Sequence, residues 1–263
     1  TLALASNGVT INQTGSITTT GVGQSSHMPT IMALLGYSAA DTGNADGILA
    51  FSDADVTVNS ANINASGDGI DANAKNTGNI KITTKGTLTA GEEGIDAYSA
   101  GGNIEIVNNA VLTANGTGST GTLSGIIATA DVGTAIITNT ASIISTAGDG
   151  INVANVVGGS TIKNSGDITA TTAGKFVIAG GDAVETATTT AGTLTGNTDL
   201  GAGNDSFTAS GGALVGSTFM GSDDDVATLT GTVDVTKAPQ FDGGTGTDVL
   251  NIDGLTMNGF TAA

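Results

Sequence analysis

A nine-residue phrase recurs along the chain and limits the fold more than any other feature. Each copy begins with Ile, with a polar residue two positions later, Gly or Ala four positions later and Ile or Leu six positions later. A shorter copy, VNSANINA, starts at Val58. The full copies start at Ile11 (INQTGSITT), Ile82 (ITTKGTLTA), Ile106 (IVNNAVLTA), Ile137 (ITNTASIIS) and Ile162 (IKNSGDITA). The last four starts lie 24 to 31 residues apart, and a period of roughly 20–50 residues is typical of solenoids, propellers and repeat arrays.

Apolar and polar residues alternate within the repeat, which predicts β-strands. Segments 80–82, 104–106 and 151–153 read IKI, IEI and INV, the pattern of a half-buried strand. A propeller blade needs about 40 residues and an aromatic signature, whereas only 3% of these residues are aromatic. Three short strands in each period predict an all-β fold, a single-stranded right-handed parallel β-helix of roughly nine or ten coils. We expect one domain over residues 1–263.

Stacking of coils explains the residue types of the repeat. Equivalent residues of neighbouring coils lie about 4.8 Å apart, so inward Ile, Leu and Val form ladders. Asn at the repeated polar position is expected to hydrogen-bond the Asn above and below. This position holds Gln13, Thr84, Asn108, Asn139 and Asn164. A Gly–Ile pair is expected to turn the chain back into the core at the end of each coil. These glycines are Gly47, Gly69, Gly94, Gly125 and Gly150.

Acidic residues surround several of these glycines, as in GDGIDA (67–72) and GEEGIDA (91–97). We interpret them as solvated corners that contribute to the net charge of −18. The alternative is a pair of carboxylates that hydrolyses a sugar. The chain has no Trp platform and no Arg, which disfavours that alternative. The acids are Asp68, Asp71, Glu92, Glu93, Asp96 and Asp149.

The last third of the sequence, 189–263, predicts shorter coils with glycine-acid turns. Its phrases are LGAGNDSFTA, MGSDDDVATL and FDGGTGTDVLNI. Stacking would align Asp205, Asp225 and Asp248 into an oxygen-rich column of the kind that suits Ca²⁺. The segment GGTGTDVLN also fits the nonapeptide of calcium-binding β-rolls once. The alternative is that glycine-Asp pairs only form tight turns. No other cofactor is predicted.

Three segments interrupt the repeat. The longest, 22–46, predicts an inserted loop with a short helix between Pro29 and Gly36. Its apolar face either packs on the coil or covers the open N-terminal end of the stack, or the segment binds a partner. The candidate partner-binding residues are His27, Met28, Ile31, Met32, Leu35 and Tyr37. Smaller loops are predicted at 115–124 and 173–182. His27 is the only His, and without a G-x-S-x-G elbow we do not expect it to be catalytic.

The charge balance excludes two classes of partner. Six Lys stand against 24 acids, whereas nucleic-acid binding needs a basic surface. An anionic membrane surface would repel the chain for the same reason. No run of 18 apolar residues predicts a membrane-spanning helix, and no signal-peptide pattern is expected in this stretch.

The N-x-G-x-I-T-A…G-D-G-I coils, with the late phrases DLGAGNDSF and FDGGTGTDVLNI, resemble the passenger domain of a bacterial type V (classical) autotransporter. The resemblance covers nearly the whole chain apart from 22–46. It implies a precursor with a C-terminal translocator β-barrel, and display on, or release from, the outer surface of a Gram-negative cell. It also implies a virulence-related adhesin that binds a host protein, a host glycan or other copies of itself. We therefore expect a non-catalytic binding protein. The alternatives are a carbohydrate-active β-helix enzyme and a structural stalk for a missing effector region.

Overall fold

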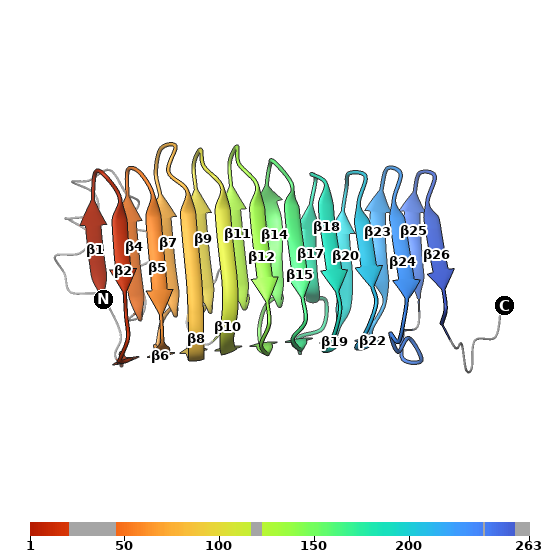
Figure 1. The fold of residues 1–263 in the computed structure, drawn as a ribbon, viewed down its shortest axis with the longest axis horizontal. Helices are drawn as coiled ribbons and strands as arrows, with labels where there is room; N and C mark the ends of the chain where they lie inside the picture. The colour runs from red at the N-terminus through yellow and green to blue at the C-terminus, as the bar shows by residue number, and fades with distance from the viewer. Residues whose placement is uncertain (21–45, 117–122, 239, 256–263) are drawn as a thin grey trace.

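The computed structural model describes residues 1–20, 46–116, 123–238 and 240–255, and every regular element in these ranges is a β-strand. The strands pair in parallel into two long sheets, of ten and sixteen strands. Figure 1 shows them side by side along one long axis, with residues 2–5 at one end of the stack and residues 249–253 at the other. The fold is therefore a parallel β-helix solenoid, as the repeat predicts.

The ten-stranded sheet receives one strand from each coil, so the described chain makes ten coils, in agreement with the predicted nine or ten. We number the coils in this order. The strands are β1 (Leu2–Ala5), β4 (Ile48–Ser52), β7 (Ile70–Ala74), β9 (Ile95–Ser99), β11 (Ile126–Ala130), β14 (Ile151–Val156), β17 (Phe176–Gly181), β20 (Asn197–Gly201), β23 (Thr218–Ser222) and β25 (Phe241–Thr245).

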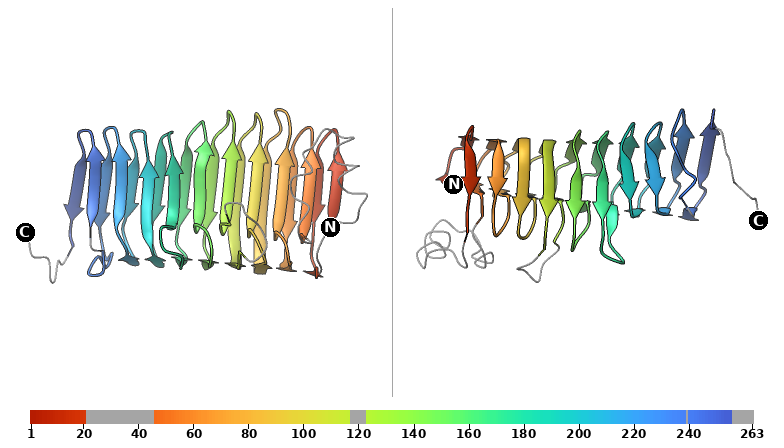
Figure 2. Two further views of the ribbon diagram at one scale, coloured as in Figure 1. Left: turned by 180° about the vertical axis from the view of Figure 1, so that it is seen from behind. Right: turned by 90° about the horizontal axis from the view of Figure 1, so that it is seen from below.

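The sixteen-stranded sheet bends at a corner, so most coils contribute two strands to it (Figure 2). The first side holds β2 (Val9–Asn12), β5 (Val56–Ser60), β12 (Ala135–Asn139), β15 (Ser160–Asn164), β18 (Glu185–Thr189), β21 (Ser206–Ala209), β24 (Val226–Thr230) and β26 (Val249–Asp253). The second side holds β3 (Ser16–Thr18), β6 (Asn62–Asn64), β13 (Ile143–Ser145), β16 (Ile168–Ala170), β19 (Thr193–Thr195) and β22 (Ala213–Val215). Strands β8 (Ile80–Ala90) and β10 (Ile104–Ala114) run through the corner without a break.

A continuous aliphatic core fills the inside of the stack. The isoleucines that follow the corner glycines pair one above the next and have no solvent exposure. They are Ile48, Ile70, Ile95, Ile126 and Ile151. Full burial of one such side chain stabilises the fold by about 2 kcal/mol. The preceding glycines are required because the coils approach closely: a Cβ on Gly69 would lie 2.5 Å from the carbonyl oxygen of Gly94.

The predicted asparagine ladder is present and lies inside the stack. Asn108 donates from Nδ2 to Oδ1 of Asn139 at 2.8 Å, and Asn139 donates from Nδ2 to Oδ1 of Asn164 at 2.8 Å. Thr84 donates to Asn108 at 2.6 Å and extends the ladder by one coil. All four side chains are buried, so these hydrogen bonds satisfy polar groups that water cannot reach.

The structure differs from the prediction at one of the interrupting segments. Residues 173–182 are not a loop throughout, because Phe176–Gly181 form β17 of the ten-stranded sheet. The sequence hides this strand because Val177 stands where the second to sixth coils have the corner glycine. The predicted helix in 22–46 and most of the 115–124 loop lie outside the described residues. Among the residues that are described, no helix could cross a membrane.

Candidate functional site

On the first side of the sixteen-stranded sheet, one register position changes from apolar to acidic along the stack. In the early coils it holds aliphatic core residues, and in the sixth coil Ser160. The residue paired with Ser160 in the seventh coil is Glu185. The pairing of Thr186 with Ser206 then places Asp205 next in line. Strand register continues the series to Asp225 and Asp248. We call Glu185, Asp205, Asp225 and Asp248 the acid column.

The acid column points into the solenoid. Along β18, Glu185 lies on the same face as Ala187, which packs in the core. Asp205 shares its face with Phe207, and Asp225 shares its face with Ala227. Burial follows from this alternation, since Glu185 is 0%, Asp205 2% and Asp225 1% exposed. Asp248, in the last described coil, is exposed.

Backbone hydrogen bonds from one coil to the next hold the acid column together. The N–H of Glu185 donates to Oδ1 of Asp205 at 2.7 Å, and the N–H of Asp205 donates to Oδ1 of Asp225 at 2.7 Å. The N–H of Asp225 donates to Oδ1 of Asp248 at 3.1 Å. Each aspartate therefore uses one oxygen to bind the coil before it.

The second oxygen of the two buried aspartates is unused. Within the described ranges, Oδ2 of Asp205 and Oδ2 of Asp225 are buried and have no hydrogen-bond partner. Burial raises the pKa of Asp205 to about 8, with Glu185 and Asp225 adding repulsion. Burial likewise raises the pKa of Glu185 to about 7 and raises the pKa of Asp225. A carboxyl pKa is raised where the surroundings do not stabilise the negative charge of the ionised group.

A cavity of about 110 Å³ lies at the C-terminal end of the acid column. Asp225 and Asp248 line it together with Phe241 and Leu250. The ring of Phe241 lies 6.5 Å, centroid to centroid, from that of Phe207, which forms part of the core beside Asp205. The acid column therefore has apolar side chains beside it, and the cavity at its end is large enough for water or a hydrated ion.

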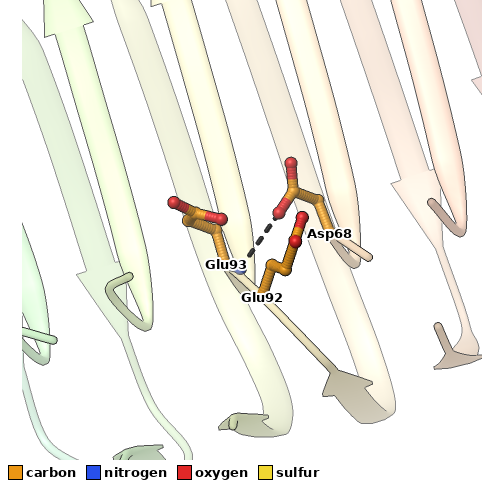
Figure 3. A group of neighbouring side chains, drawn as sticks. All are labelled: Asp68, Glu92 and Glu93. Atoms are coloured by element: carbon orange, nitrogen blue, oxygen red, sulfur yellow. Dashed lines mark hydrogen bonds between the residues drawn. The ribbon is translucent and has the colours of Figure 1, made fainter. Parts of the chain in front are cut away.

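The second acidic group lies at a corner of the third and fourth coils. Figure 3 shows Asp68, Glu92 and Glu93, whose carboxylate oxygens approach within 4.8 Å of one another. The N–H of Glu93 donates to Oδ1 of Asp68 at 3.0 Å. The pKa of Asp68 is raised well above its usual value, first by burial and then by Glu93.

The solvated-corner interpretation is wrong for these acids. Asp68 is 4%, Glu92 2%, Glu93 9% and Asp149 4% exposed. Asp68 and Asp149 accept N–H groups of the next coil, which a solvent-facing side chain would not reach. Asp149, for example, accepts the N–H of Phe176 at 2.9 Å. Asp71 and Asp96 lie half-buried on the strands β7 and β9 instead of at the corners.

A ridge of exposed valines marks one corner of three consecutive coils. Val132 and Val157 are each 68% exposed, and Val184 is 52% exposed. They lie between the strands of the ten-stranded sheet and the first side of the other sheet. We call these three residues the valine corner. Single exposed apolar residues are ordinary, but these three recur at the same corner of consecutive coils, and exposed apolar residues that gather on one surface are typical of a contact surface.

The predicted sites meet the structure to different extents. Asp205 and Asp225 do lie together, with Asp248 at the end, as the spacing of the turns predicts; their binding of calcium stays a prediction. Glu185 was missed, because the glycine-acid phrase GGD just before it falls in the predicted 173–182 loop. Its register with Asp205 is the signal that finds it. The candidate partner-binding residues lie outside the described ranges. They are His27, Met28, Ile31, Met32, Leu35 and Tyr37.

Comparisons with protein families, with curated proteins and with solved structures find no match to this chain.

Proposed function

We propose that this chain is an extracellular, non-catalytic binding module, the passenger of a type V autotransporter. In this proposal it is displayed on a Gram-negative cell or released from it. It adheres to a host surface or to other copies of itself. The repeated coils and late glycine-acid phrases support the family, and the stacked parallel coils are the architecture that such a passenger needs. The observation that carries binding is the valine corner, because it places the three most exposed large apolar side chains of the described residues at one corner of an acidic molecule.

The contact would be mainly apolar in this proposal. Three valines with exposures of 52–68% contribute apolar area that water leaves on association. The net charge of −18 opposes the approach of a second copy or of an acidic cell surface, and salt screens this repulsion. Binding should therefore strengthen as ionic strength rises from low values, the opposite of binding through ion pairs.

The experiment displays the chain on bacterial cells and measures settling of the suspension and adherence to cultured epithelial cells. Val132→Thr, Val157→Thr and Val184→Thr are combined in one variant, since Thr keeps the shape and strand preference of Val. Val111→Thr, at a 47% exposed position outside the valine corner, is the control. We expect about a tenfold weakening for the triple variant alone. Unchanged settling and adherence in the triple variant would contradict the proposal.

Deletion of 22–46 tests the other predicted contact. If the inserted loop binds the partner, its deletion abolishes adherence while the valine corner is intact. Adherence that survives this deletion but fails in the triple variant assigns the contact to the valine corner. Hydrolysis of a polysaccharide by the purified chain would replace the binding proposal with the enzyme alternative.

A further inference from the structure

We propose that the acid column is a buried binding site for a divalent cation, with Ca²⁺ as the best-fitting ion, held by the free oxygens of Asp205 and Asp225. The site would join the eighth coil to the ninth from the inside. It is independent of the proposed function, because it concerns how the late coils stay stacked and not what the outer surface binds.

The free oxygens are the first support. Elsewhere the chain satisfies both oxygens of a buried aspartate: in Asp149, Oδ1 accepts the N–H of Phe176 at 2.9 Å, and Oδ2 accepts Nδ2–H of Asn152 at 2.8 Å. In Asp205 and Asp225, by contrast, Oδ2 is buried and no partner is found among the described residues. Burial of an unpaired carboxylate oxygen is costly unless a ligand completes it.

The spacing of the coils is the second support. Parallel strands lie about 4.8 Å apart, and Ca²⁺ binds oxygen at about 2.3–2.6 Å. An ion midway between equivalent oxygens of two neighbouring coils therefore meets both at a normal calcium–oxygen distance. The backbone bond from the N–H of Asp205 to Asp225 fixes Oδ1 of Asp225, and its Oδ2 remains for the ion.

The local charge is the third support. The groups that act electrostatically on Asp205 are Glu185, Asp225 and Asp223. Those that act on Asp225 are Asp248, Asp223 and Asp224. All of them are acids, so the column concentrates negative charge without a cationic side chain among these neighbours. A bound divalent cation would supply the missing positive charge.

The chemistry of the donors selects the ion. The acid column offers only carboxylate oxygens, which are hard ligands that suit Ca²⁺ rather than the metals that prefer His or Cys. The cavity beside Asp225 and Asp248 provides a route by which the ion and its water reach the column. It also leaves room for water to complete the coordination, since Ca²⁺ takes about 6–8 oxygens.

The test measures calcium binding by isothermal titration and thermal unfolding of the EDTA-treated protein, with and without added CaCl₂, at neutral pH. At calcium about a hundredfold above Kd, we expect the unfolding midpoint to rise by roughly 5 °C or more. Asp205→Asn and Asp225→Asn should each abolish both the titration heat and the rise. Asn keeps the acceptor at the Oδ1 position, so both variants are expected to fold.

Two variants serve as controls. Asp253→Asn removes one acid from the exposed end of β26 and should respond to calcium as the unaltered protein does. Glu92→Gln disrupts the other acidic group and should also respond fully. A response lost in Glu92→Gln but kept in Asp225→Asn would overturn the proposal by moving the ion to that group. The proposal would be overturned if the unaltered protein bound no calcium and both Asp205→Asn and Asp225→Asn made it more stable. That result would mean that the two carboxyl groups are protonated and neutral in the folded chain.

Discussion

The backbone N–H of Asp205 donates to Oδ1 of Asp225 at 2.7 Å, across the step from the eighth coil to the ninth. Strand register places these two carboxyl groups at the position that Ile80 and Ile104 hold in the early coils. Asp205 and Asp225 lie in the same water-free interior as those isoleucines, and their side chains are 2% and 1% exposed. The stacking of coils therefore determines both the stability of the solenoid and the chemistry of its late half.

The asparagine ladder should contribute strongly to stability. Replacement of Asn139 by Ala removes the bond from Asn108 and the bond to Asn164, and it leaves buried polar groups unpaired. We expect a loss of about 3 kcal/mol in the free energy of unfolding, measured by urea denaturation. Asn59→Ala is the matched control, since Asn59 donates to Asn12 at 2.8 Å on the exposed surface. Equal losses in the two variants would contradict a special role for burial.

The close approach of coils at the Gly–Ile corners should make Gly69 intolerant of any side chain. A Cβ there would lie 2.5 Å from the carbonyl oxygen of Gly94, so Gly69→Ala must separate the coils. We expect a loss of about 2 kcal/mol or more, seen as a lower unfolding midpoint. Gly15→Ala is the control, because a Cβ at Gly15 meets nothing within 4 Å. A Gly69→Ala protein as stable as the Gly15→Ala protein would be inconsistent with the corner geometry.

The raised pKa values of the acid column predict the pH dependence of the EDTA-treated protein. The pKa of Glu185 is about 7 and that of Asp205 is about 8 in the folded chain, whereas unfolded acids titrate near 4. The folded state therefore holds more protons between these values, and stability falls as pH rises from about 5 to 8. Each such group contributes about 1.4 kcal/mol per pH unit.

Urea denaturation at several pH values measures this dependence. Asp205→Asn removes one titrating group and should flatten the fall, whereas Asp253→Asn should leave it unchanged. Stability that increases from pH 5 to 8 in EDTA would show that these carboxyl groups are ionised in the folded protein.

The fold was predictable from the repeat because each coil has the same order of strands, corners and buried apolar residues. The ladder of Asn108, Asn139 and Asn164 followed from the same register. The burial of Asp68 and Asp149 did not, because residue type alone suggests solvent exposure, and only the stacked backbone supplies the N–H groups that they accept. Glu185 was missed for a different reason: the phrase GGD that precedes it was placed in the predicted 173–182 loop, which hid the register between Glu185 and Asp205.

Disulfide formation between stacked positions tests most directly whether Glu185, Asp205 and Asp225 share one column. The chain has no Cys, so Thr186→Cys with Ser206→Cys introduces a single pair at positions that face each other on β18 and β21. Their Cα atoms should lie about 5 Å apart, within the range of a disulfide. The shifted pair, Thr186→Cys with Thr208→Cys, should lie about 8 Å apart, beyond that range. We expect mild oxidation to close the first pair and leave the second free, as shown by thiol titration. Preferential closure of the shifted pair would contradict the register that brings the acids together.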